Sequence, residues 1–459
     1  MTGFEHIAVL DIGKTNAKVV LLHAATGVEI AERRMPNLPQ AGPPYPHYDV
    51  GALWSFFLDA LKSFVDMPGF DAISITTHGA SAVLLDAMGE LALPVLDYEY
   101  QYPEQIRKAY AKIRPVFSET FSPALSGGLN LGAQIHYQKT NFPSDFSRVR
   151  AILTYPQYWA FRLTGVSANE VTSLGCHTDL WRPHKGDYSS LVDALGIRYL
   201  MAPLRSAFDT LGLVLPDLAR EIGLLRPVPV FCGIHDSNAS LLAHLVDEDP
   251  PFAVVSTGTW VINFAVGGKL HHLDPFRDTL VNVDAYGRAV PSSRFMGGRE
   301  FEMLTSQLGL LDQEQALSAL PRVIEHKLMH LPNLAAGSGP IPDRRSRWVN
   351  DSGTSIDEHW AAGCLYLALM TDICLGLIGA SGAILVEGPF ASNRVYLGVL
   401  STLLNGRVQA VSGSTGTSQG AALLAGVHPA KASAAAVMPT RLDGLAEYRA
   451  EWLERALRY

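Results

Sequence analysis

The sequence predicts an α/β protein of two domains. The chain has 459 residues, and single cores usually stop growing at roughly 250–300 residues, so two domains are expected. Hydrophobic residues make up 48% of the chain and charged residues 17%, with 40 glycines, which is typical of a well-packed globular protein. A hairpin pattern also occurs twice, over residues 7–23 and 252–266, which indicates two halves built on one plan.

Composition argues against several functional classes. A net charge of −8 speaks against a general nucleic-acid or anionic-membrane surface. Residues 1–6 lack the basic region and apolar core of a signal peptide, so we expect a cytoplasmic protein. The cysteines show neither a C-x-x-C pair nor a zinc-type spacing with histidine, and we interpret them as buried thiols in a reducing compartment; they are Cys176, Cys232, Cys364 and Cys374.

One apolar segment, residues 361–386, is long enough to span a bilayer. Asp372 lies in the middle of it, and Gly376, Gly379 and Gly382 interrupt it. We therefore interpret the segment as a buried helix followed by a core strand, with a membrane span as the alternative.

The first hairpin, residues 7–23, has two apolar strands around a short polar turn. Asp11, Gly13 and Thr15 lie at the bend. Backbone N–H groups of such a turn can cradle phosphate, and an adjacent acid can hold Mg²⁺ directly or through water. No Walker sequence occurs in the chain. The alternative is a surface turn that uses these residues for conformational reasons only.

The next segments continue an α/β pattern. Strands are expected over residues 27–35 and 72–77, the second ending at His78 and Gly79, with a helix over residues 50–65 between them. Residues 81–86 and 91–96 read as a further hairpin. Tyr98 and Glu99 close it, and they suit sugar recognition by stacking and hydrogen bonding, although an ordinary domain rim uses the same residues.

Residues 103–225 are predicted to be mainly helical, with amphipathic segments over 133–139 and 155–163. The candidate site residues in this region are His177, Asp179 and Trp181. Without a second acid or histidine at a defined spacing, we interpret them as structural residues.

The segment from Phe231 to Ser240 carries the acid of greatest chemical interest, Asp236. A strand over 228–232 ends in a glycine, His235 and Asp236 follow at a turn, and an apolar helix is expected over 237–246. This pattern holds a carboxylate where a strand stops. The alternative reading is an Asp that caps the helix.

The second hairpin repeats the plan of the first, with Ser256 in place of the acid. Two such turns facing each other across a cleft would share a nucleotide's phosphates. A third strand, residues 383–387, ends in Gly388 before a helix over 395–404. A strand over 408–411 and a run of small residues over 412–425 follow, and the small residues suit either close approach to a purine or a tight helix–sheet contact. Residues 431–436 read as a linker before a helix over 442–457.

These motifs, in this order, resemble the FGGY family of carbohydrate kinases. The segment from Asp11 to Lys18 is similar to the family's first phosphate motif, and Gly233 to Asp236 is similar to its catalytic segment. Ser256 to Trp260 resembles the second phosphate motif, and Glu387 to Asn393 the adenosine motif. The resemblance covers nearly the whole chain. Lys14 and the Glu387–Pro389 run depart from the usual pattern, which has a small residue or threonine and a run of glycines.

The resemblance implies two actin-like (ribonuclease H-like) domains around a central cleft. Residues 1–246 would bind the sugar and supply the catalytic base, and residues 247–459 would bind ATP. It implies Asp236 as the base, and Asp11 with Asp236 near Mg²⁺. It places Gly13, Lys14, Thr15, Asn16, Thr257, Gly258, Thr259, Gly388, Pro389 and Asn393 at ATP and its phosphates, and His78, Gly79, Tyr98, Glu99, His235 and Asp236 at the sugar.

The implied activity is transfer of the γ-phosphoryl group of MgATP to a primary hydroxyl of a small ketose. The His235–Asp236 pair and the Ser256–Trp260 turn are similar to those of L-fuculose and L-rhamnulose kinases within the family. A pentulose or polyol kinase, a non-catalytic sugar or nucleotide sensor, and an actin-fold ATPase are the alternatives. The expected partners are the sugar and MgATP, with a homodimer as the default assembly.

Overall fold

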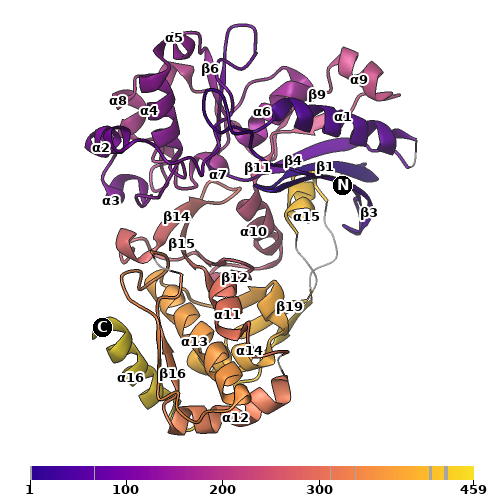
Figure 1. Ribbon diagram of the computed structural model, residues 1–459. Coiled ribbons are helices and arrows are strands. Elements are labelled where there is room, and N and C mark those ends of the chain that lie inside the picture. Colours follow the sequence, from indigo (N-terminus) through magenta and orange to yellow (C-terminus); the bar gives the residue numbers. More distant parts are fainter. Residues whose placement is uncertain are drawn as a thin grey trace. The chain divides into compact units, whose positions relative to one another are not determined.

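The computed structural model describes residues 3–66, 68–310, 312–335, 337–412, 416–427 and 433–458. The chain folds into two compact units (Figure 1). The first unit comprises residues 1–247, 281–289 and 415–431, and the second comprises residues 248–280, 290–414 and 432–459. Sequence reasoning placed one boundary at residue 246, whereas two short later segments also fold with the first unit.

The first unit is built on a mixed sheet. Its strand order is β3 (Glu29–Pro36), β2 (Asn16–His23), β1 (His6–Ile12), β4 (Ala72–Thr77), β10 (Pro229–Phe231) and β9 (Thr210–Leu213), and β11 (Ile234–His235) also pairs with β4. The β1–β2 pair is antiparallel, as the hairpin pattern predicted, and β1, β10 and β11 all run parallel to β4. Nearly every residue of β1 and β4 is buried, because layers of helices cover both faces of such strands.

Helices and short strands complete the first unit. The helices are α1 (Val50–Val65), α2 (Glu104–Ile113), α3 (Phe117–Thr120), α4 (Leu131–Asn141), α5 (Pro143–Phe146), α6 (Tyr155–Thr164), α7 (Val171–Leu174), α8 (Ser190–Ala194), η1 (Arg198–Leu200), α9 (Pro216–Ile222), α10 (Asp236–Asp247), α15 (Thr417–Ala422) and η4 (Leu423–Ala425). The short strand pairs are β5 (Ala82–Leu85) with β6 (Ala151–Thr154), and β7 (Trp181–Arg182) with β8 (Asp187–Tyr188).

Two expectations about this unit have clear outcomes. The hairpin over residues 81–96 forms only at its turn, where Leu85 and Leu91 make an antiparallel bridge and the Ala92 N–H donates a 2.8 Å hydrogen bond to the Leu84 carbonyl; along its length β5 pairs with β6. The structural reading of Asp179 is confirmed: the side chain is buried, and Tyr110 and Arg114 donate hydrogen bonds to it at 2.7 and 2.9 Å.

The second unit repeats the sheet plan of the first. Its strand order is β14 (Thr279–Val283), β15 (Ala289–Phe295), β13 (Val261–Val266), β12 (Phe252–Thr257), β18 (Ala383–Glu387), β19 (Val408–Ser412) and β20 (Ser433–Ala436). Residues 281–283 of β14 are among those that fold with the first unit. As in the first unit, a hairpin (β12–β13) lies beside a strand parallel to it (β18). The internal repeat seen in the sequence is therefore a repeat of topology. Residues 433–436, expected within a linker, form β20 and pair with β19.

The remaining elements of the second unit pack on this sheet or beside it. They are η2 (Pro275–Arg277), α11 (Gly297–Thr305), α12 (Gln313–Glu325), β16 (Met329–Leu331), β17 (Arg347–Val349), α13 (Ile356–Leu377), η3 (Pro389–Ser392), α14 (Arg394–Leu403) and α16 (Leu445–Arg458). Within the described residues, α13 is the one helix long and apolar enough to cross a membrane, but most of it is buried inside the fold. Its Asp372 accepts a 2.8 Å hydrogen bond from Arg449. The prediction of a buried helix followed by a core strand is confirmed.

The small-residue run over 412–425 packs within the first unit over residues 416–425, whereas Ser412 ends β19 of the second unit. Figure 1 shows α15 beside the first sheet, and Ser74 of β4 donates a 2.7 Å hydrogen bond to the Ala421 carbonyl. A Cβ at Gly420 would lie 1.9 Å from the Ala239 carbonyl oxygen of α10. Of the two readings of this run, the tight packing contact is therefore the one observed. Residues 413–415 lie outside the described part of the chain.

A matched pair of glycine-to-alanine changes tests this contact. Gly420→Ala should lower the midpoint of urea unfolding, because the clash with α10 costs about 1–3 kcal/mol or more. Gly376→Ala in α13 meets nothing within 4 Å, and it should leave stability unchanged or raise it by up to about 1 kcal/mol through helix propensity. Equal midpoints for the two variants would contradict the contact.

Candidate functional site

Parallel pairing brings several strand ends of the first unit to one place. Ile12 and His235 each align with Thr77 of β4 in the sheet register. The residues that follow these strands are therefore neighbours: Gly13 after β1, His78 after β4, and Asp236 after β11. Strand ends of this kind are the usual position of ligand sites in α/β folds.

Asp236 is the chemical centre of this group. Its side chain is 28% exposed. The Ser237 N–H donates a 2.6 Å hydrogen bond to Oδ1, the Ser237 hydroxyl lies 3.3 Å from the same oxygen, and His235 Nε2 lies 3.1 Å from it. Within the part of the chain that the structure describes, Oδ2 accepts no hydrogen bond. Burial raises the pKa of Asp236 to about 6, which suits a general base near neutral pH.

His78 offers a second polar group. Its ring lies 5.0 Å from those of Tyr48 and Tyr155 and 5.4 Å from that of Tyr98. Burial lowers the pKa of His78 to about 4, so the ring is neutral. Nδ1 lies 2.9 Å from the Gly79 carbonyl, to which it donates, and among the described residues the buried Nε2 has no partner. This nitrogen can accept a hydrogen bond from a hydroxyl group.

Lys14 lies with the residues expected to bind sugar. The sequence placed it among the phosphate-binding residues, but its ammonium group bonds Asp97, lies 3.5 Å from Glu99 Oε2 and lies 4.6 Å from the centre of the Tyr98 ring. Asp97 was not predicted as a site residue. Its separation from Lys14 by 83 positions explains why no local pattern revealed the pair.

The turn of the first hairpin is held by its own backbone. Gly13 N–H donates to the Asn16 carbonyl at 2.8 Å, and the Asn37 amide donates to the Gly13 carbonyl at 2.8 Å. Thr15 and Asn16 are exposed, and the Asn16 amide donates a 3.1 Å hydrogen bond to the Thr15 hydroxyl. An exposed hydroxyl and amide on a fixed turn can rotate toward phosphate oxygens.

Asp11, the expected metal residue, bonds groups of the first unit. Ser418 donates a 2.6 Å hydrogen bond to Oδ2, Thr417 also donates to Oδ2, and Lys18 Nζ lies 3.5 Å from it. Among the described residues, no three His, Cys, Asp or Glu side chains gather as a metal site. The charge of Asp11 also contributes to the raised pKa of Asp236. Two carboxylates whose charges influence each other fit a Mg²⁺ that arrives bound to phosphates, which would supply its other ligands.

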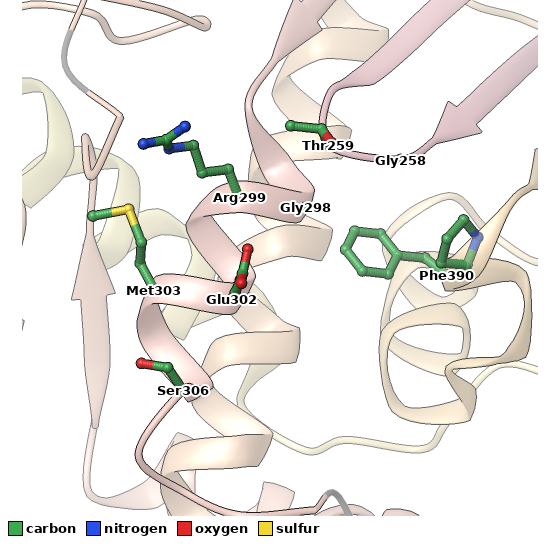
Figure 2. A pocket seen from close by; sticks show the side chains of 9 residues that line it. Gly258, Thr259, Gly298, Arg299, Glu302, Met303, Ser306 and Phe390 are labelled. Carbon is green, nitrogen blue, oxygen red and sulfur yellow. The ribbon is translucent and has the colours of Figure 1, made fainter. Parts of the chain in front are cut away.

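The second unit contains a pocket of about 690 Å³ at the end of its own hairpin. Figure 2 shows the residues of α11 along the pocket, with Phe390 on a facing element and Thr259 at the hairpin turn. The lining residues come from the β12–β13 turn, α11 and η3, and they are Gly258, Thr259, Gly298, Arg299, Glu302, Met303, Ser306, Pro389 and Phe390.

Close backbone approach shapes this pocket. A Cβ at Gly388, where φ is +80°, would lie 2.0 Å from the Thr257 carbonyl oxygen, and a Cβ at Gly298 would lie 1.9 Å from the Gly258 carbonyl oxygen. Only glycine fits at these two positions. Thr257 ties the strand ends together, because its hydroxyl donates to the Glu387 carbonyl and accepts a 3.1 Å hydrogen bond from the Phe390 N–H.

The predicted nucleotide residues therefore occupy different positions in this unit. Gly258, Thr259 and Pro389 line the pocket, while Thr257 and Gly388 support its walls. Asn393 accepts a 3.0 Å hydrogen bond from the Tyr396 N–H and so caps α14. The α11 residues of the pocket were missed. The glycine pair that opens this helix, Gly297–Gly298, was the available signal.

Comparison with known families assigns most of the chain. Residues 6–243 match the N-terminal domain of the FGGY family of carbohydrate kinases, and residues 249–434 match the carbohydrate kinase FGGY C-terminal domain. The chain belongs to the FGGY family. The family's fold, two actin-like domains, agrees with the repeated sheet plan of the two units.

Individual relatives differ in their sequence identity to this chain and in the length over which they match it. A carbohydrate kinase from Novosphingobium aromaticivorans of known structure is 37% identical, with a TM-score of 0.92 and 98% of each chain covered. An L-fuculokinase from Salmonella typhi is 26% identical over 58% of this chain and 57% of its own length, and a rhamnulokinase from Halalkalibacterium halodurans is 24% identical over 55% and 54%. The chain thus spans little more than half the length of these two curated FGGY relatives.

Arg299 is the one cationic residue among those that line the pocket described above in the second unit. Its substitution therefore tests whether this pocket binds the phosphates of a nucleotide. Arg299→Ala should weaken MgADP binding about 10- to 100-fold, as expected for loss of hydrogen bonds to a charged group. Isothermal titration calorimetry on the full chain would measure it. Arg345→Ala removes another exposed arginine of the same unit and should not change the affinity. Equal affinities in the two variants would contradict the assignment.

Proposed function

We propose that this FGGY chain is an ATP-dependent kinase that phosphorylates a primary hydroxyl of a small ketose, of the L-rhamnulose or L-fuculose type, in carbohydrate catabolism in the cytoplasm. The observation that carries the proposal is the environment of Asp236. Its carboxylate is largely buried, has a pKa raised to about 6 and keeps one oxygen without a partner in the described residues. These are the properties of a general base.

The proposed reaction is a direct, in-line transfer. The acceptor hydroxyl attacks the γ-phosphorus of ATP, a new O–P bond forms, and the bond to the bridging oxygen of ADP breaks as ADP leaves. Asp236 Oδ2 takes the hydroxyl proton. Such transfers have a loose transition state, so positioning and electrostatic stabilisation supply most of the acceleration. Bound Mg²⁺, near Asp11 and Asp236, would neutralise phosphate charge.

The acceptor side of the proposed site favours a neutral sugar over a sugar acid. Three carboxylates stand against one ammonium group there, and both His78 and His235 are neutral because burial lowers the pKa of each to about 4. An anionic acceptor would meet a net negative charge. The charged groups are Asp97, Glu99, Asp236 and Lys14.

The proposal is tested by ADP release with MgATP and a panel of acceptors. The panel is L-rhamnulose, L-fuculose, L-ribulose, D- and L-xylulose, D-ribulose, erythritol and glycerol, with a control without acceptor. Stimulation by a 6-deoxyketose supports the proposal in full. Stimulation by a pentulose or polyol keeps the kinase and replaces the substrate. Release without acceptor would indicate an ATPase, and nucleotide binding without turnover would indicate a sensor.

Asp236→Asn should lower kcat by about 10²–10⁴-fold, the usual contribution of a general base. The acceptor KM should change little, because the amide keeps the size of the carboxylate. Asp59→Asn, a change at an exposed carboxylate of α1, should retain parental rates. A variant Asp236→Asn with parental kcat would exclude Asp236 as the base.

The pH dependence follows from the same residue. Asp236 acts as a base only when it is deprotonated, and its raised pKa of about 6 means that activity is present above pH 6 and falls tenfold per pH unit below it. His78 and His235, whose pKa values are lowered to about 4, do not titrate in this range. The profile of kcat/KM for the acceptor measures it, and activity maintained down to pH 4.5 would contradict the raised pKa.

A further inference from the structure

Lys14 joins the turn of the first hairpin to residues 97–99, a segment far from it in sequence. Its ammonium group donates hydrogen bonds to Asp97 Oδ1 and, at 3.3 Å, to the Tyr48 hydroxyl. The side chain of Lys14 is 18% exposed and that of Asp97 is 11% exposed. This lysine is therefore held in one position, unlike the long charged side chains of an ordinary surface turn.

One N–H group of the ammonium remains for a ligand. An ammonium group has three donors, and Asp97 and Tyr48 accept from two of them. Glu99 Oε2 lies 3.5 Å away in an ion pair, and the Glu99 side chain is 68% exposed. An exposed side chain can move aside for a ligand, so the third donor is accessible.

Asp97 offers the complementary group, a hydrogen-bond acceptor. Its Oδ1 accepts from the Lys14 ammonium, from the Tyr48 hydroxyl at 3.4 Å and from the Glu99 N–H at 3.2 Å. None of these three donors reaches Oδ2. The Asp97 N–H donates a 2.9 Å hydrogen bond to the Pro46 carbonyl, which fixes the backbone here. A fixed carboxylate whose donors converge on one oxygen presents the other oxygen to a ligand.

The pair of Lys14 and Asp97 lies beside the proposed acceptor site. Lys14 Nζ lies 4.6 Å from the centre of the Tyr98 ring, and this ring lies 5.4 Å from the ring of His78. Burial raises the pKa of Tyr98, and the charges of Asp236 and Asp97 add to this effect. The pair and the proposed base are therefore neighbours of one aromatic side chain.

The charges around Lys14 favour a neutral ligand over phosphate. Asp97 and Glu99 carry two negative charges against the single positive charge of Lys14. A phosphate group at this ammonium would meet a net negative cluster, whereas a hydroxyl group would not. Hydrogen bonds in which one partner is ionised are also stronger than those between neutral groups.

We propose that Lys14 and Asp97 form a specificity-determining pair that recognises two neighbouring hydroxyl groups of the acceptor, neither of which is the one phosphorylated. Lys14 donates to one hydroxyl, and Asp97 Oδ2 accepts from the other. The ligand class is a neutral ketose or polyol with free vicinal hydroxyls. The inference rests on the proposed kinase function and refines its acceptor site. It replaces the phosphate contact expected for Lys14 from the sequence.

The first test compares Lys14→Met and Asp97→Asn with the parent in the full chain. Methionine keeps an unbranched side chain but has no donor. Each variant should raise the acceptor KM about 10- to 100-fold, as expected for loss of hydrogen bonds to a charged group. The value of kcat at saturating acceptor should stay within about threefold of the parent, because such a contact holds substrate and transition state alike. The affinity for MgADP, measured by calorimetry, should not change.

Specificity gives a second readout. L-Rhamnulose and L-fuculose differ only in the configuration of one hydroxyl-bearing carbon, and so do L-ribulose and L-xylulose. A site that hydrogen-bonds a hydroxyl group discriminates against a substrate that cannot place one there. The parent should therefore prefer one member of at least one pair by its kcat/KM. Lys14→Met should reduce that preference about tenfold or more.

Controls separate a local effect from a loss of folding. Lys62→Met removes another paired lysine of the first unit, whose ion pair with Glu221 measures 3.2 Å, and it should keep parental kinetics. Circular dichroism reports whether each variant is folded. Loss of Lys14 alone leaves the buried Asp97 without its counter-charge, which is destabilising. If that variant does not fold, the double variant Lys14→Met with Asp97→Asn, which removes both charges, decides by the same KM and kcat criteria.

Four outcomes would overturn the inference. Weaker MgADP binding with an unchanged acceptor KM in Lys14→Met would make Lys14 a phosphate contact. An unchanged acceptor KM in folded variants of both residues would make the pair purely structural. Equal kcat/KM values of the parent for both members of each sugar pair would exclude recognition of a hydroxyl configuration. A parent without acceptor-dependent turnover would remove the proposed kinase function and this inference together, whereas the first three outcomes remove this inference alone.

Discussion

Burial of one carboxylate, Asp236, is the constraint on which the first unit depends. Removing a charge from water is costly unless hydrogen bonds compensate for the lost solvation. Here the compensation comes from the next residue in the chain, through the Ser237 N–H and hydroxyl. These donors are correctly placed only because β11 is fixed against β4 and α7. The same contacts therefore fix the strand and position the proposed catalytic base.

Both units meet the same geometric problem at their strand ends. Parallel pairing aligns β1 with β4 and β12 with β18, which crowds the segments that leave them. A Cβ would collide at Gly79 after β4 and at Gly388 after β18, and also at Gly298 in the first turn of α11. In the second unit these close backbone contacts shape the walls of the pocket, and in the first unit Gly79 leaves room for the His235 ring. These turns need glycine because backbone segments approach each other closely there. A bound phosphate would use the same close approach to the backbone.

The sequence predicted those parts of the protein that depend on local pattern. The paired hairpins, the strand end before Asp236 and the helix over residues 50–65 all follow from periodicity within a short window. The contacts that it did not reveal depend on distant pairing. Lys14 bonds Asp97, Thr417 and Ser418 bond Asp11 across more than 400 positions, and β5 pairs along its length with β6, whereas the nearer segment meets it only at the turn. A short strand such as β20 is recognised only once its partner β19 is known.

The hydrogen-bond donors to Asp236 converge on one oxygen, and this arrangement agrees with its raised pKa. Burial and the charge of Asp11 raise this pKa, whereas the hydrogen bonds from Ser237 lower it. A general base works best when its pKa lies near the operating pH. The groups that raise the pKa of Asp236 and those that lower it should therefore nearly balance. Donors on both oxygens would lower the pKa further and would also block the approach of a hydroxyl. Donors on Oδ1 alone stabilise the buried charge enough to keep it ionised at neutral pH, while Oδ2 retains the lone pairs that proton transfer requires.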